Sequence, residues 1–159
     1  KASIDNYVYE EGECTDIKVG YMTDEFLRIG NISLQCGRMP EKDDEAAIEW
    51  DSLIKLNQGT QIGQEIHIEV REGSSQTTET IEKTYKLTGI LNNYTNVWNG
   101  GEYIPGIVVT EGEGEAVNRI GKAAYIYSSN NYINNYRDIY DGLVKKTHKE
   151  LIYNSEGSF

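Results

Sequence analysis

The chain has 159 residues, of which 38% are hydrophobic, and 26 acidic side chains against 15 basic ones give a net charge of −11. The hydrophobic content excludes a disordered tail, and the length is enough for one domain or two small subdomains. The charge argues against nucleic acid or an anionic membrane surface as a partner, because phosphates and acidic headgroups would be repelled.

Short strands are predicted for the first part of the chain, at residues 3–9, 16–22, 32–36 and 46–48. The first two flank a turn at residues 10–13, and we expect them to form a hairpin. Two short helices are also predicted in this part of the chain. Thr23 is a candidate cap for the first helix, which Gly30 ends, and Asp51 is a candidate cap for the second, which continues through Leu56.

The clearest strand pattern lies at residues 65–70, where isoleucine and valine alternate with polar side chains that we expect to face outward. A second long strand is predicted at residues 81–91. Together these segments predict an antiparallel hairpin, with the polar residues 72–80 forming the loop at its tip.

After residue 104 the predicted strands alternate with helices. Strands are expected at 106–110, 123–127 and 151–153, and helices at 113–120 and 131–147. In the first of these helices Ala116 and Val117 are expected to face inward. In the second, Tyr132, Tyr136 and Tyr140 recur at helical spacing, so we interpret them as packing residues and not as a binding stripe.

The cysteines and histidines do not form a metal-binding pattern. Cys14 and Cys36 have no Cys-x-x-Cys spacing and no histidine nearby, which argues against a zinc site. Their spacing leaves open whether they form a disulfide, although two separate thiols are favoured. His67 lies in an alternating strand and His148 near the end of a predicted helix. We therefore expect neither a metal nor another cofactor.

A long loop at residues 92–103 combines asparagine, glycine and aromatic side chains. Tyr94, Trp98 and Tyr103 are candidates for a contact loop that stacks on sugar rings or peptides. Loops of this composition also occur as plain connectors between subdomains, and we favour that interpretation.

No catalytic motif is evident in the sequence. Its acidic pairs lie in turns or at helix starts, where carboxylates are expected for solvation and dipole reasons: Glu10 and Glu11, Asp43 and Asp44, Glu113 and Glu115. The chain lacks the spacing of a calcium loop, a nucleophile elbow or a phosphate-binding glycine loop. We therefore predict that the chain is not an enzyme.

A compact turn precedes the strand at residues 46–48. Gly37 permits a backbone angle that other residues avoid, and Pro40 fixes the direction of the chain. Arg38 offers a planar fork of donors, and Glu45 follows it where a strand that folds back would meet it. We predict that Arg38 binds a carboxylate or backbone carbonyls at this corner, with Glu45 as the first candidate.

This corner, with the later segments 61–66 and 85–90, resembles the MacB-like periplasmic core domain, the extracytoplasmic domain of FtsX/MacB-type ABC transporter permeases. The family pattern is a Gly-Arg-x-Pro corner, an acidic residue that opens a hydrophobic strand, a glycine turn, and a strand that ends in Val-Gly-Ile. The matching residues here are Gly37, Arg38, Pro40, Glu45, Gly63 and Gly89. Gln64, Ala46 and Ala47 depart from the usual residues, and these departures concern packing.

The resemblance implies an α+β fold of two subdomains. An α/β porter-like subdomain would be built from both chain ends, residues 1–35 and 104–159, and a mostly β sabre-like insert would comprise residues 36–103. The domain would be non-catalytic, and it would couple ATP hydrolysis in the cytoplasm to export, release or signalling outside the membrane. A secreted carbohydrate- or peptide-binding module is the alternative function.

The family also implies partners and a location. A cytoplasmic ATPase subunit and a second permease copy are the expected partners, with a peptide, lipoprotein or cell-wall component as a further candidate. The acidic surface and the start at Lys1 without methionine fit an excised segment on the extracytoplasmic side of a Gram-positive cell membrane.

Overall fold

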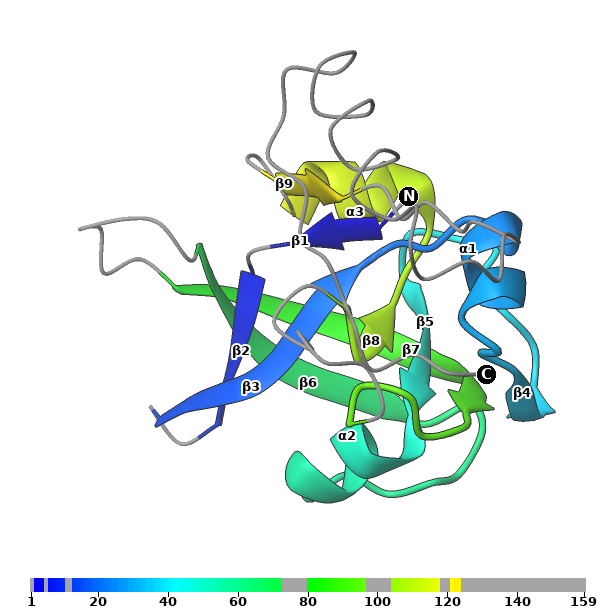
Figure 1. The fold of residues 1–159 in the computed structure, drawn as a ribbon. Coiled ribbons are helices and arrows are strands. Elements are labelled where there is room, and N and C mark those ends of the chain that lie inside the picture. The colour runs from blue at the N-terminus through cyan, green and yellow to red at the C-terminus, as the bar shows by residue number, and fades with distance from the viewer. Residues whose placement is uncertain are drawn as a thin grey trace, which may run out of the picture. The chain divides into compact units, whose positions relative to one another are not determined.

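The computed structural model describes residues 2–4, 6–10, 13–72, 80–96, 104–117 and 121–123 (Figure 1). The predicted helix at 131–147 and strand at 151–153 lie outside these residues, as does most of the strand predicted at 123–127. All the described residues belong to one compact unit, Lys1–Tyr125.

Seven of the described strands form one mixed sheet in the spatial order β4-β7-β5-β8-β3-β2-β6. Their bounds are β2 (Asn6–Glu10), β3 (Glu13–Gly20), β4 (Leu34–Gly37), β5 (Glu45–Glu49), β6 (Glu65–Glu72), β7 (Thr80–Leu91) and β8 (Ile107–Val108). Because β6 also pairs with β7, six of these strands close into a barrel, and β4 lies outside the ring. Figure 1 shows β3 crossing in front of β6 and β7.

Both predicted hairpins are confirmed, since β2 pairs with β3 and β6 with β7 in antiparallel fashion. The other pairings were not predicted. The two-residue strand β8 lies between β3, to which it is parallel, and β5, to which it is antiparallel. This short strand therefore completes the barrel by joining segments that are far apart in the sequence.

The 12-residue strand β7 has three neighbours. Lys86 is the register partner of both Glu45 and Glu65, so β5 and β6 lie on opposite edges of β7. The antiparallel strand β4 pairs only with the end of β7. The register of β5 against β7 skips Thr88, which forms a bulge, and the Thr88 hydroxyl donates to the carbonyl oxygen of Ala46 at 3.2 Å.

The first two helices are short, α1 (Asp24–Ile29) and α2 (Trp50–Lys55). The predicted cap of α1 is confirmed, because the Thr23 hydroxyl accepts a hydrogen bond from the Phe26 amide at 3.3 Å. The predicted cap of α2 is wrong. That helix begins at Trp50, one residue before Asp51, and its N-cap residue is Glu49, whose side chain makes no cap bond.

The third helix, α3 (Glu111–Val117), begins before its predicted start at residue 113. Thr110 precedes it, and its hydroxyl accepts from the Glu113 amide at 3.2 Å. Val117 is buried as predicted, but Ala116 is exposed. A separate two-stranded sheet pairs β1 (Ala2–Ile4) with β9 (Gly121–Ala123) in antiparallel fashion.

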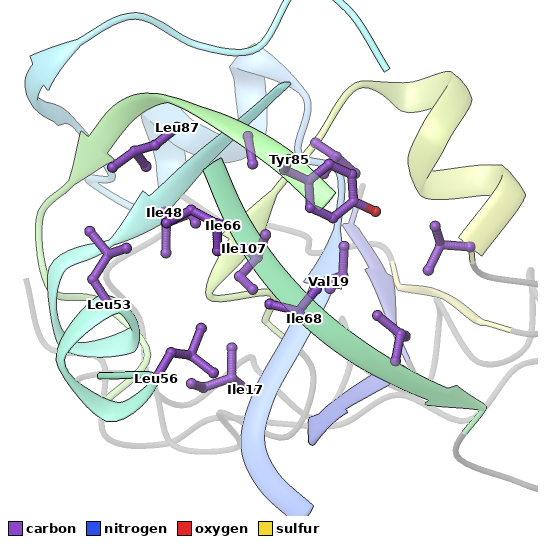
Figure 2. Packing of buried hydrophobic residues seen from close by; sticks show 14 of the residues in the cluster. Ile17, Val19, Ile48, Leu53, Leu56, Ile66, Ile68, Tyr85, Leu87 and Ile107 are labelled. Carbon is purple, nitrogen blue, oxygen red and sulfur yellow. The ribbon is translucent and has the colours of Figure 1, made fainter. Parts of the chain in front are cut away.

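Two hydrophobic clusters lie on opposite faces of the barrel wall, because alternate residues of a strand face opposite sides. Ile48 and Ile107 join the inner cluster, whereas their neighbours Ala47 and Val108 join the outer one. Figure 2 shows inner residues from several strands meeting, with Leu53 of α2 and its C-cap residue Leu56 at one end and Tyr85 toward the other. The outer cluster includes Met22, Phe26, Ile32, Leu91, Tyr94 and Ile104.

The predicted subdomain boundaries fall within this barrel. β2, β3 and β8 come from the segments assigned to the chain-end subdomain, and β5, β6 and β7 come from the predicted insert. Strands of the two groups pair directly, β2 with β6 and β5 with β8. The described parts of both predicted subdomains thus share one core, and the coarser prediction of an α+β fold is confirmed.

Candidate functional site

The predicted corner is held by a two-point ion pair. Arg38 donates from Nη1 to Glu45 Oε2 at 2.8 Å and from Nη2 to Oε1 at 2.6 Å. The Glu45 side chain is only 6% exposed, whereas that of Arg38 is 46% exposed. The Glu41 amide adds a third bond to Glu45 Oε2 at 3.0 Å. The predicted contact between Arg38 and Glu45 is therefore confirmed.

These donors fix the charge of the Glu45 carboxyl. The hydrogen bonds from Arg38, followed by that from the Glu41 amide, lower the pKa of Glu45 from 4.5 to about 2. In return, Glu45 raises the pKa of Arg38. At neutral pH both groups are charged, so the corner is closed by a charge-assisted, planar contact.

The glycines of the motif allow β4 and β7 to approach each other closely. Gly37 has a φ of +78°, and a Cβ there would overlap the carbonyl oxygen of Thr88. A Cβ on Gly89 would in turn overlap the carbonyl oxygen of Arg38. Gly63 has a φ of +94°, and its amide donates to the Leu87 carbonyl at 2.7 Å. The motif glycines therefore lie along β7.

Pro40, the remaining motif residue, lines a hollow of about 340 Å³ beside the corner. Met39, Met22 and Val108 contribute apolar surface to this hollow, and Glu111 is one of two acidic residues in its lining. A second hollow, of about 290 Å³, is lined by Asp44, Gly63, Glu65, Thr84 and Lys86. The corner therefore adjoins the first hollow, and the Gly63 turn adjoins the second.

Glu49 is a fully buried carboxylate that was not predicted from the sequence. Its Oε1 accepts from the Tyr94 amide at 2.7 Å and the Thr95 amide at 2.8 Å, and its Oε2 from the Ser52 hydroxyl at 2.9 Å. An acidic residue directly after the apolar run Ala46–Ile48 was the available signal. Glu49 anchors the start of the 92–103 loop to α2.

The aromatic contact loop is only partly described. Tyr94 is 2% exposed, its hydroxyl donates to the Pro105 carbonyl at 2.6 Å, and burial raises the pKa of the phenol. Tyr94 is therefore a packing residue and offers no stacking face. Trp98 and Tyr103 lie outside the described residues, and their role stays a prediction.

A third buried carboxylate, Glu113, connects α3 to β7. Its Oε1 accepts from Lys83 Nζ at 2.9 Å and from the Tyr85 hydroxyl at 2.7 Å. Burial and the bond to Glu113 raise the pKa of Tyr85 above its usual range. The phenol therefore stays protonated and acts as a donor.

Among the described residues, no group of three or more His, Cys, Asp or Glu side chains could hold a metal ion. His67 is exposed on β6, where its Nδ1 lies 2.9 Å from the Thr84 hydroxyl. Cys36 is free and exposed. His148 lies outside the described part of the chain.

No family model matches the chain, and no curated protein does. Among solved structures it is similar to "a domain of a putative permease protein" from Porphyromonas gingivalis, with 11% sequence identity and a TM-score of 0.41. The similarity covers 94% of this chain and 65% of that one. None of the described helices is long and apolar enough to cross a membrane.

Proposed function

We propose that the chain is a non-catalytic extracytoplasmic domain of an ABC transporter permease of the FtsX/MacB type. The observation that carries the proposal is the corner, where residues of the family-like motif meet: Gly37, Arg38, Glu45 and Gly89. The two glycines allow the close approach of β4 and β7, and Arg38 and Glu45 form the two-point ion pair, so each residue type is needed at its position. These roles support the view that the match to the family motif is not due to chance.

The use of the buried carboxylates supports a role without catalysis. Glu45 is bound by Arg38, Glu49 by loop amides, and Glu113 by Lys83 and Tyr85. A general acid or base must exchange protons with a substrate, whereas these groups are occupied by donors inside the fold. They stabilise connections between elements, which is what a domain that transmits movement requires.

The finer parts of the proposal follow the resemblance. Residues 1–35 and 104–159 would form the porter-like part and 36–103 the sabre-like part, which share the barrel through the pairings of β2 with β6 and of β5 with β8. Both would lie on the outer side of a Gram-positive cell membrane. Movement would be driven by a cytoplasmic ATPase and shared with a second permease copy. The exported or signalling partner would be a peptide, a lipoprotein or a cell-wall component.

The exposed thiol of Cys36 provides a direct test in the full-length protein. Intact cells that express it would be treated with a membrane-impermeant maleimide, with Cys36→Ser as the control for labelling of other thiols. We expect the wild-type protein to be labelled in intact cells and the Cys36→Ser variant to remain unlabelled. Labelling that requires lysis of the cells would overturn the extracytoplasmic location.

The complete gene provides a second, independent test. A permease domain requires hydrophobic spans of about 20 residues beside it, together with an ATPase encoded nearby. Flanking sequence without such a span on either side would overturn the proposal.

A further inference from the structure

Helix α3 is poorly suited to stand on its own. It has seven residues, Glu111–Val117, and two of them are glycines, Gly112 and Gly114. Glycine is among the weakest helix formers, and isolated helices of this length are not stable in water. Contacts with the barrel must therefore hold α3 in place.

Two side chains make these contacts, one just before α3 and one within it. Before the helix, the Thr110 hydroxyl bonds to Asp43 of the linker that precedes β5. Within it, Glu113 Oε1 accepts from Lys83 Nζ at 2.9 Å and from the Tyr85 hydroxyl at 2.7 Å. Glu113 thus attaches α3 to β7 through two donors, Lys83 and Tyr85.

The two glycines of α3 differ in their surroundings. A Cβ on Gly114 would lie 2.7 Å from Cδ1 of Tyr21, so the helix can approach the barrel only because this residue is glycine. A Cβ on Gly112 would make an ordinary contact, 3.4 Å from an Asp43 carboxylate oxygen. Alanine at the two positions should therefore have opposite effects on the attachment of α3.

The helix covers one end of the inner cluster. Val117 belongs to that cluster, and Tyr85, which is 1% exposed, directs its hydroxyl toward α3 (Figure 2). Thr110 and Glu111 also line the hollow of about 340 Å³ beside the corner. Displacement of α3 would expose the end of the barrel and remove one wall of this hollow.

We propose that α3 is a lid on the barrel, which opens as a unit while the strands stay folded. Weak helix propensity makes the segment easy to release, and the bonds of Glu113 and Thr110 hold it closed. Opening exposes Tyr85 and apolar surface of the inner cluster. The inference does not depend on the proposed function.

Native-state hydrogen exchange of the 159-residue chain tests the lid directly. The Gly114 amide donates to the Thr110 carbonyl at 2.8 Å, and the Leu87 amide of β7 donates to the backbone carbonyl of Gln64 at 2.9 Å. We expect the Gly114 amide to exchange through an opening whose free energy is lower than that for the Leu87 amide and depends little on denaturant concentration. Equal free energies and equal denaturant dependence at both amides would overturn the lid.

Variants of α3 test which contacts hold it. Glu113→Gln should speed exchange at Gly114 roughly 10- to 100-fold, as expected for a lost charge-assisted bond. Glu111→Gln removes an exposed acid from the first turn of the same helix and is the control; the lost interaction with the helix dipole should speed exchange by no more than about fivefold. An unchanged rate in Glu113→Gln would contradict the proposed attachment.

The glycine pair gives a test that does not rely on charge. Gly112→Ala should slow exchange across α3 by about fivefold through better helix propensity. Gly114→Ala should speed it, because the new Cβ collides with Tyr21. Changes in the same direction for both variants would overturn the proposed packing of the lid.

Discussion

The corner at Arg38 and the lid at α3 each depend on a buried glutamate, yet their surroundings differ. Glu45 uses both oxygens, binds a planar guanidinium and a backbone amide, and opens a strand inside the barrel. Glu113 uses one oxygen for two donors and belongs to a short, glycine-rich helix at the barrel's end. A buried carboxylate on a strand inside the barrel therefore holds a permanent contact, whereas one on a short helix at the end of the barrel holds a contact that can open.

The largest effect is expected from Gly37→Ala at the corner. The variant places a Cβ against the Thr88 carbonyl at a φ of +78°, and we expect a loss of about 3 kcal/mol in the free energy of unfolding. Urea denaturation measures this loss.

Gly63→Ala is the matched control for that variant. Its φ is +94°, but the nearest side-chain atom, Lys86 Cε, lies 4.0 Å from the new Cβ, so only the backbone penalty of about 1 kcal/mol remains. Equal losses in the two variants would show that close packing at Gly37 has no part in the stability of the corner.

Arg38→Ala should lower the urea midpoint clearly, because it leaves the nearly buried Glu45 carboxylate without its two strongest donors. Arg28→Ala removes an ion pair with Glu25 in which both side chains are more than half exposed, and it should have little effect. Equal urea midpoints for Arg38→Ala and Arg28→Ala would show that the Arg38–Glu45 ion pair does not stabilise the fold.

The pH dependence follows from the lowered pKa of Glu45. A carboxyl with a pKa of about 2 in the folded state and 4.5 when unfolded stabilises the fold above pH 4.5. That stability is lost as the pH falls through this window. The difference in unfolding free energy between the wild-type chain and Glu45→Gln should therefore shrink as the solution is acidified. A difference that stays constant would contradict the assigned ion pair.

The smallest effect is expected from Thr110→Ala in the lid. Loss of the bonds to Asp43 and to the Glu113 amide should lower the free energy of α3 opening by about 1 kcal/mol, measured as faster exchange at Gly114. Thr23→Ala removes a comparable cap from α1 and serves as the control. It should lower the free energy of unfolding and leave the exchange of α3 unchanged.

Local features of this fold were predictable from the sequence. Alternation at residues 65–70 gave the inward face of β6, Thr23 marked the start of α1, and the spacing of Arg38 and Glu45 gave the ion pair. These predictions succeeded because each depends on residues that are near in sequence and on rules of single strands, caps and turns.

Features that depend on distant contacts were not predictable. The strand predicted at residues 106–110 contains β8, but no local pattern indicates that β8 pairs with both β3 and β5 and so closes the barrel. The Thr88 bulge likewise shifts the register of β5 against β7. Asp51 was a reasonable cap, but it instead binds Asn93 and Asn96 of a loop more than 40 residues away. Strand pairing, register and the partners of Asp51 depend on residues far away in the sequence, so a local sequence pattern cannot predict them.

Hydrogen exchange in Thr23→Ala tests most directly whether the lid moves independently of the barrel. Exchange is compared with the wild-type chain at two amides, Leu87 in β7 and Gly114 in α3. We predict that Leu87 exchanges about fivefold faster, following the loss of about 1 kcal/mol in global stability, and that Gly114 is unchanged. Equal acceleration at both amides would show that α3 opens only when the whole barrel unfolds, which would contradict the proposal that α3 is a lid.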